Sequence, residues 1–463
     1  TVIAGTNGVK LGAFVISAGA AEGVNVSSIT VNLSTDEAAT ITNMYLTDAA
    51  GVTVGTAKNV PGTSNIYSLS PNIALAANAS KAFALFGNVK SASNVGPWVA
   101  NIDASGSGMV TGNAVAAASA TDIQTMTVAS TGTLTVVNGS MPDAAILIAG
   151  STGNEVAEYQ FSAVNEGFTV DKLKLKVSNN FATSTAAVTL AWTDKNGVAK
   201  TKDGMFLAGA QSAATATFTG LDMYVPANGD ATLKVYVSLT SIASGAFSGA
   251  NSTISLDGNE GFNAVGDSGT PDTTLASADL ESKNFIVRKS KPTFAKLDAG
   301  TDPVGGALYK FSVVADNAGN IEIKQLSFVV TTTGCEVNDL YLYEPNASVT
   351  LTDTAVDPTT EGSTVKLLVS AVDDDVLLIG NTAQTYEVRG VVTSYGTNDS
   401  ILVRMRQDVT SGVANAVANT INGSSYNTWS DRSGVLGVHT TATADWTSGY
   451  LVKDMGQTQS FSK

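Results

Sequence analysis

The feature that most constrains the fold of this chain is an internal repeat of roughly 150 residues, present in three copies. In each copy, two runs of alternating apolar and polar residues flank a short polar turn, at residues 11–33, 156–177 and 308–328. Phe14, Phe161 and Phe311 align the copies at spacings of 147 and 150 residues. Alternation with a period of two is typical of β-strands that bury one face. The repeat therefore predicts three copies of one β-module.

Three further blocks follow in the same order in each copy. A strand enters a hairpin turn at Asp48, Asp194 and Glu344, another strand follows a turn at Asn78, Asn228 and Asn381, and a last alternating strand lies at residues 98–102, 252–256 and 401–405. Asp and Asn beside Gly are the residues expected in such turns. Helical periodicity is nearly absent.

The chain is therefore predicted to be all-β, with three tandem immunoglobulin-like β-sandwich modules and negligible helix. The predicted modules are residues 1–122, residues 123–283, and residues 284–463 with an aromatic-rich C-terminal extension.

The first module lacks a strand that the other two have. An extra strand precedes the repeat at residues 126–137 and 285–297, whereas the first copy begins at residues 2–5, which align with residues 147–150. A missing strand leaves an unpaired edge and an exposed part of the core. Either the strand was removed with a leader or is not needed, or a neighbouring subunit donates it.

The predicted donor is the strand-like C-terminal run at residues 449–461. The residues predicted to act in self-assembly are therefore Val2, Ile3, Leu451, Val452 and Phe461.

Composition and charge exclude several classes of protein. The chain has 40 acidic and 25 basic residues, a net charge of −15, which argues against nucleic-acid binding. No apolar run is long enough to span a membrane as a helix. The chain opens at Thr1 without a signal sequence, and we expect a mature protein whose leader has been removed. Cys335 is the only cysteine, so no intramolecular disulfide can form. Together these features indicate an extracellular, cell-surface protein.

Catalytic motifs are missing from the sequence. It contains no G-x-S-x-G elbow, no phosphate-binding loop and no zinc pattern. The single histidine, His439, is expected on a loop or strand edge. We therefore expect no enzymatic activity.

Calcium is the one cofactor that the sequence suggests, because acidic loops supply the oxygen ligands that it needs. The candidate ligands are Asp373, Asp374, Asp375, Asp257, Asn259 and Glu260. Adjacent carboxylates also occur in solvated turns, so both interpretations stay open. Asn-x-Ser/Thr sequons predict glycosylation, with the candidate sites Asn25, Asn78, Asn251 and Asn346.

Aromatic residues cluster near the C-terminus, at Tyr426, Trp429, Trp446 and Tyr450. Such residues pack in cores or self-associate, and exposed ones stack on sugars. Both uses stay open.

Parts of the last two copies resemble a known group of proteins. Residues 429–433, 439–441 and 445–453 are similar to the ends of large repeat-containing surface proteins of ultra-small candidate-phyla bacteria, and the strand at 324–328 and linker at 285–289 look similar too. The resemblance implies an exported S-layer-type or filament-forming protein without catalytic residues. The N-terminus departs from the family, since it has neither leader nor opening strand.

The expected function is that of a structural protein that assembles with copies of itself into an S-layer lattice outside the cell. Two alternatives stay open. One is a subunit of an extracellular filament or pilus built by donor-strand exchange, and the other is an adhesin that binds cell-envelope carbohydrate through its C-terminal aromatics.

Overall fold

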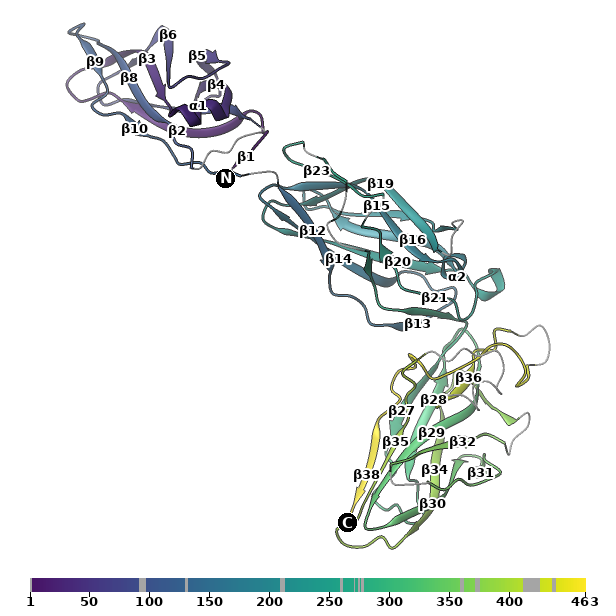
Figure 1. Ribbon diagram of the computed structural model, residues 1–463. Helices are drawn as coiled ribbons and strands as arrows, with labels where there is room; N and C mark the ends of the chain where they lie inside the picture. Colours follow the sequence, from purple (N-terminus) through teal and green to yellow (C-terminus); the bar gives the residue numbers. More distant parts are fainter. Residues whose placement is uncertain are drawn as a thin grey trace.

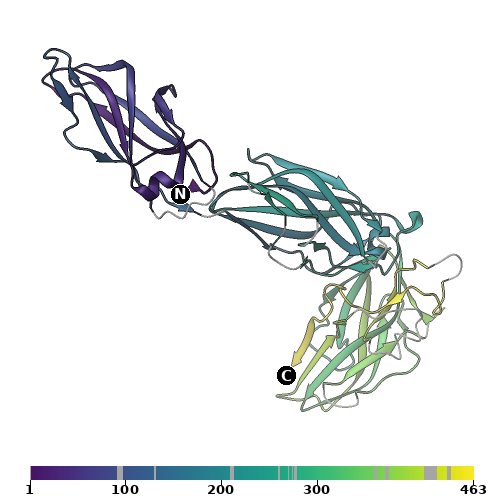
Figure 2. The same ribbon diagram turned by 45° about the horizontal axis from the view of Figure 1, so that its top comes forward.

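The fold was established from a computed structural model, which describes residues 2–90, 97–129, 132–208, 213–258, 261–269, 271–273, 275, 279–358, 362–370, 375–410, 425–434 and 439–463. These residues form many short strands and very little helix, which confirms the all-β sandwich prediction. Their buried apolar side chains form three clusters, each between two sheets. Figure 1 shows three β-bodies in a bent row, called modules 1, 2 and 3 below, and Figure 2 shows the same row from a second direction. No helix among the described residues is long and apolar enough to cross a membrane.

Module 1 packs a four-stranded sheet against a five-stranded one. The first sheet has the order β2 (Val9–Ser17), β7 (Ser80–Val89), β4 (Ile41–Asp48), β5 (Thr53–Lys58). The second has the order β10 (Thr121–Asp122), β8 (Asn101–Gly108), β3 (Val24–Asn32), β6 (Ser64–Leu75), with β9 (Ala114–Ala116) also on β8. Helix α1 (Thr35–Thr40) begins at a capping box of Ser34 and Glu37.

Module 2 has one more strand in its first sheet. The order is β12 (Thr133–Asn138), β14 (Asn154–Val164), β20 (Asp230–Leu239), β16 (Thr185–Thr193), β17 (Ala199–Gly204). The opposite sheet has the order β18 (Leu207–Ala208), β19 (Ala213–Val225), β15 (Phe168–Ser178), β22 (Ser255–Leu256), β25 (Leu280–Glu281), with β23 (Asn263–Gly266) and β24 (Pro271–Asp272) attached. Helix α2 (Asn179–Thr183) and the 3-10 turn η1 (Ile242–Ser244) are short.

Module 3 repeats the five-stranded arrangement. The first sheet has the order β27 (Pro292–Leu297), β28 (Tyr309–Ala315), β34 (Gln384–Thr393), β30 (Glu336–Glu344), β31 (Val349–Thr350). The second has the order β37 (Trp446–Thr447), β36 (Thr428–Ser430), β29 (Ile321–Thr333), β35 (Ser400–Met405), β38 (Thr458–Ser462), with β32 (Thr364–Leu368) and β33 (Leu377–Ile379) on β29.

The linkers between modules are themselves strands. β11 (Val128–Ala129) runs parallel to β1 (Val2–Ile3), and β26 (Phe285–Arg288) runs parallel to β13 (Ala145–Ile148) and antiparallel to β21 (Asn251–Ser252). Each linker strand therefore pairs with the module that it leaves, and the chain then forms the opening strand of the next module, β12 or β27. Consistent with this pairing, the N-terminus lies at the end of module 1 that faces module 2 (Figure 1).

The ladder registers correct one detail of the predicted repeat. Phe14 pairs with Phe83, Tyr159 with Leu233 and Phe311 with Tyr386, and each of these partners lies five residues after the turn asparagine of its module. Phe14 therefore corresponds to Tyr159, and the predicted match to Phe161 was wrong by two residues. A shift of two keeps every side chain on the same face, so the alternation pattern cannot detect it.

The predicted hairpin turns have closely similar geometry in modules 1 and 2. Asp48 Oδ1 accepts hydrogen bonds from the backbone N–H groups of Ala50 and Val52, both at 3.0 Å. Asp194 Oδ1 accepts from Asn196 and Val198, both at 2.9 Å. These donors favour the ionised carboxylate, so the backbone hydrogen bonds lower the pKa of both aspartates.

Acidification should therefore weaken both turns. The folded-state pKa lies below the ordinary value of 3.8, so the contribution of each carboxylate to stability is present above that value and is lost as the pH falls through the lower folded pKa. We expect the double variant D48N/D194N to lose less thermal stability than the unmodified protein between pH 6 and pH 3, because an amide has no charge to lose. Melting curves at each pH measure this difference, and equal acid sensitivity of the two proteins would contradict it.

Candidate functional site

Among the described residues, the first sheet of module 1 contains no counterpart of the opening strands of modules 2 and 3. In modules 2 and 3 the strands β12 and β27 pair antiparallel with β14 and β28. In module 1, β2 corresponds to β14 and β28. It pairs with β7 on one side and, within the described residues, with no strand on the other. One edge of β2 is therefore free for pairing with an additional strand.

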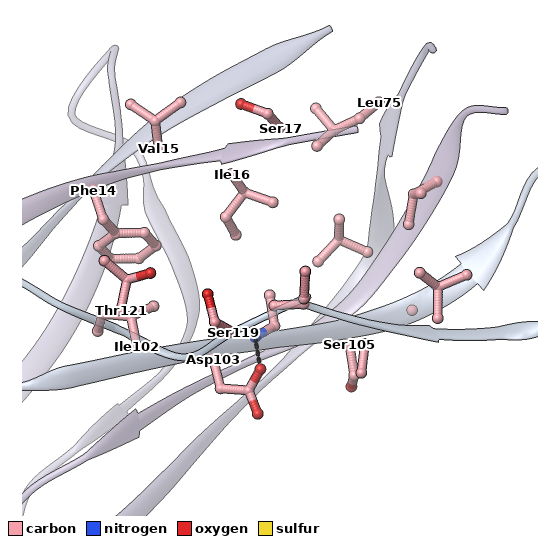
Figure 3. A pocket seen from close by; sticks show the side chains of 18 of the residues that line it. Phe14, Val15, Ile16, Ser17, Leu75, Ile102, Asp103, Ser105, Ser119 and Thr121 are labelled. Atoms are coloured by element: carbon pink, nitrogen blue, oxygen red, sulfur yellow. Dashed lines mark hydrogen bonds between the residues drawn. The ribbon is translucent and has the colours of Figure 1, made fainter. Parts of the chain in front are cut away.

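A cavity of about 340 Å³ lies along this free edge. It is lined by β2, by Val24, Val26 and Leu75, and by residues of β8, β9 and β10 on the opposite sheet. Figure 3 shows Phe14 and Ile16 pointing from β2 into this space, while Val15 and Ser17 point to the other side of the strand. We call this space the β2 groove. Its apolar floor is part of the core of module 1.

The side chains in the β2 groove are less buried than their counterparts. Phe14 and Ile16 are only half-buried. The ladder registers place Tyr159 and Phe161 at these positions in module 2, where both are fully buried, and Phe311 and Val313 in module 3, where both are 1% exposed. The core of module 1 is therefore incomplete on this flank.

In module 2 the opening strand fills the corresponding position. Leu134 and Val136 of β12 are buried opposite Ala163 and Phe161 of β14. Asn138 Nδ2 also donates to the carbonyl of Glu281 in β25, at 3.1 Å, so β12 links the two sheets. In module 2, β25 pairs with β22, which is next to the central strand β15. In module 1, β10 pairs with β8, which is next to the central strand β3, so β10 corresponds to β25. β10 also lines the β2 groove. The groove thus lies where an opening strand would pack.

The five residues predicted to act in self-assembly lie in two modules. Val2 and Ile3 form β1 and pair with β11 of the same chain. The run 449–461 is not one strand, because Leu451 has a φ of 63°. Val452 and Phe461 are 2% and 3% exposed and belong to the core of module 3, where β38 pairs with β35. A donated C-terminal strand would therefore have to leave its own module first.

The predicted calcium ligands fall partly outside the described residues, namely Asp373, Asp374, Asn259 and Glu260. Asp257 is 1% exposed and forms ion pairs with Lys174 at 2.7 Å and Lys176 at 3.2 Å. The carboxylate of Asp375 lies 3.8 Å from Lys324 Nζ. In the part of the chain that the structure describes, no three carboxylate, His or Cys side chains cluster as metal ligands would. Calcium binding stays a prediction.

The predicted glycosylation sites differ in accessibility. Asn78, Asn251 and Asn346 have exposed side chains, whereas Asn25 lies half-buried in β3. Glycosylation likewise stays a prediction.

The two C-terminal tryptophans belong to the interior. Trp429 and Trp446 are 3% and 0% exposed, which favours packing over sugar stacking for both. Tyr426 and Tyr450 are half-buried, and Arg406 lies over the ring of Tyr426 at 4.4 Å.

His439 lies outside the strands and helices, as expected for a loop residue, but its side chain is buried. Its Nδ1 contacts the carboxylate of Glu322, and its Nε2 lies 2.8 Å from Asp445 Oδ1 and 3.1 Å from Ser430 Oγ. Ser430 is fully buried, so this serine–histidine contact is closed to solvent. Sequence reasoning missed the cluster because Glu322 lies more than a hundred residues away in the chain.

Next to this cluster, polar contacts join modules 2 and 3. The Asp431 carboxylate is fully buried and accepts hydrogen bonds from Ser248 Oγ at 2.5 Å and from the Lys289 backbone N–H at 2.7 Å. The Arg288 guanidinium donates to Thr447 Oγ1 at 2.8 Å. Ile146 of module 2 is buried in the apolar cluster of module 3. The two modules are therefore fixed to each other at this junction.

Replacing Asp431 with Ala should loosen the junction. The change removes the acceptor of one hydrogen bond from module 2 and one from the linker, and bonds to a charged group contribute about 1.5–3 kcal/mol each. We expect faster proteolysis at the linker and a broader range of shapes in small-angle X-ray scattering, with unchanged β-sheet content by circular dichroism. D353A, on an exposed residue of module 3, is the matched control. Equal rigidity of D431A and the unmodified protein would show that Asp431 does not hold the modules.

Comparisons with known proteins give a distant likeness. No protein-family model and no curated protein sequence matches the chain. Among solved structures, the full-length major pilin SpaD of Corynebacterium diphtheriae is 12% identical, with 86% of this chain and 87% of that chain covered and a TM-score of 0.18. BcpA, the major pilin subunit of Bacillus cereus, is 9% identical, with 86% and 89% covered and a TM-score of 0.17. The C-terminal domain of the Streptococcus pyogenes antigen I/II-family protein AspA is 10% identical, with 56% and 84% covered and a TM-score of 0.19. These neighbours are two bacterial pilins and an antigen I/II-family protein, but likeness at this level carries no argument about this chain. The resemblance to candidate-phyla surface proteins stays a prediction.

Proposed function

We propose that this protein is a non-catalytic structural subunit of the cell surface that assembles with other copies through the free edge of β2. The observation that carries the proposal is the β2 groove, an unpaired strand edge beside the half-buried Phe14 and Ile16. An added strand would satisfy the backbone of β2 and remove both side chains from water. Strand addition therefore lowers the free energy of module 1.

The expected product of this contact is a filament. A strand that fills the groove comes from a different surface of the neighbouring copy, whereas two β2 edges that pair with each other would give only a closed dimer. A contact between two different surfaces repeats in one direction and forms an open chain unless its rotation closes a ring. The predicted S-layer lattice would need further lateral contacts, which makes it the second outcome to look for.

Blocking the β2 groove should stop assembly. We expect the unmodified protein to form filaments in negative-stain micrographs as its concentration rises. Ile16→Asp should leave it monomeric, because a carboxylate in the groove cannot be buried without a partner. Val15→Asp is the matched control, since Val15 lies on the same strand, faces the opposite side and is 61% exposed.

Imaging with added calcium and with a chelator tests the predicted cation at the same time. Sheets in place of filaments would support the lattice. Monomers at every concentration, or equal assembly of I16D and V15D, would overturn the proposal.

A further inference from the structure

We propose that the β2 groove accepts strand β38 of a second copy, antiparallel to β2 and with Phe461 opposite Ile16. The inference rests on the proposed function and specifies which segment of the neighbouring copy makes the contact.

The opening strands of modules 2 and 3 define what fits the groove. Phe161 and Val313 correspond to Ile16, and the residues opposite them are Val136 and Phe294. Two residues earlier, Leu134 and Pro292 lie opposite the alanines that correspond to Ala18. Two residues later, Asn138 and Lys296 lie opposite the aromatic residues that correspond to Phe14. The groove therefore selects an apolar side chain opposite Ile16 and a polar one opposite Phe14.

Strand β38 has this pattern. Ser-Phe-Ser-Lys at residues 460–463 matches Thr-Phe-Ala-Lys at residues 293–296 of β27. With Phe461 opposite Ile16, Lys463 lies opposite Phe14, as Lys296 lies opposite Phe311. Gln459 is the one departure, since Leu134 and Pro292 hold its position in β12 and β27.

The charge of the groove complements this segment. The lining includes Asp103 and Asp122 and, among the described residues, no Lys or Arg. Thr121, the neighbour of Asp122, lines the groove together with Phe14, and Lys463 would lie opposite Phe14 (Figure 3). Unlike charges favour this register over the reverse strand direction, which would carry Lys463 away from Phe14.

The position of β38 allows it to be exchanged. In the described part of the chain it is an edge strand that pairs with β35 alone. β12 and β27 connect modules, so removing either of them would disturb two modules at once. Moving β38 to another copy opens the edge of β35 and the site of Phe461 in module 3, while it closes the edge of β2 and covers Phe14 and Ile16 in module 1.

A complementation experiment tests the donor and the acceptor separately. F461S has an intact groove but a defective donor strand. I16D has a defective groove but an intact donor strand. We expect each variant alone to be monomeric by size-exclusion chromatography with light scattering. An equimolar mixture should form dimers and nothing larger, because I16D can donate to F461S while neither product can grow. Mixing F461S with V15D, whose groove and donor are both intact, should give longer chains.

A peptide experiment keeps the proposal testable if F461S fails to fold. A peptide of residues 456–463 should bind the V15D variant saturably and should protect the β2 amides of that variant in hydrogen exchange. The same peptide should bind the I16D variant poorly. The same peptide with Phe461→Ser should bind about tenfold more weakly or worse, because it lacks the buried ring. A peptide of residues 290–297, from β27, serves as the positive control.

The outcomes separate this inference from the proposed function. If the unmodified protein assembles but the F461S and I16D mixture stays monomeric, or if F461S alone assembles normally, β38 is not the donor and the proposed function stands. If the β27 peptide binds and the β38 peptide does not, the groove accepts strands but β38 is again overturned. If no copy assembles and neither peptide protects β2, both proposals fail.

Discussion

The architecture depends on how the flank of each sandwich is closed by its opening strand. β12 and β27 supply backbone partners for β14 and β28, and they cover Phe161 and Val313, so the cores of modules 2 and 3 are sealed. Burial of that one flank converts an edge strand into an internal one and removes two large side chains from water. In the part of module 1 that the structure describes, the same frame has no closing strand, so its unpaired edge and its half-buried core residues lie in one place.

The same constraint gives the chain a direction. Each opening strand comes from the linker that has just paired with the preceding module, as β26 pairs with β13 before β27 begins. Neighbouring modules are therefore coupled through continuous backbone pairing as well as through contacts such as those of Asp431. In the proposed assembly, a strand that enters module 1 from another copy would extend this order beyond one chain, and the polarity of the modules would become the polarity of the filament.

Much of this fold could be predicted because the sequence features were local. Alternation located the strands, and Asp48 and Asp194 marked hairpins through hydrogen bonds to residues two and four positions ahead. The failures involve information that local patterns do not hold. The sequence pattern aligned Phe14 with Phe161 and not with Tyr159, because a shift of two residues leaves every side chain on the same face of the strand. The buried contacts of His439 were not predicted because its partner Glu322 comes from a distant strand. The ion pairs of Asp257 with Lys174 and Lys176 of β15 were likewise not visible in the local sequence around Asp257.

The net charge of the chain bears on how the proposed self-association would work. Each copy carries a net charge of −15, so two copies repel at long range and broad face-to-face contact is unfavourable. A strand in a groove concentrates the favourable free energy in backbone hydrogen bonds and a few apolar side chains, which salt screens little. Added salt weakens the repulsion but leaves the groove contact nearly unchanged, so the physics of this surface favours assembly that strengthens with ionic strength.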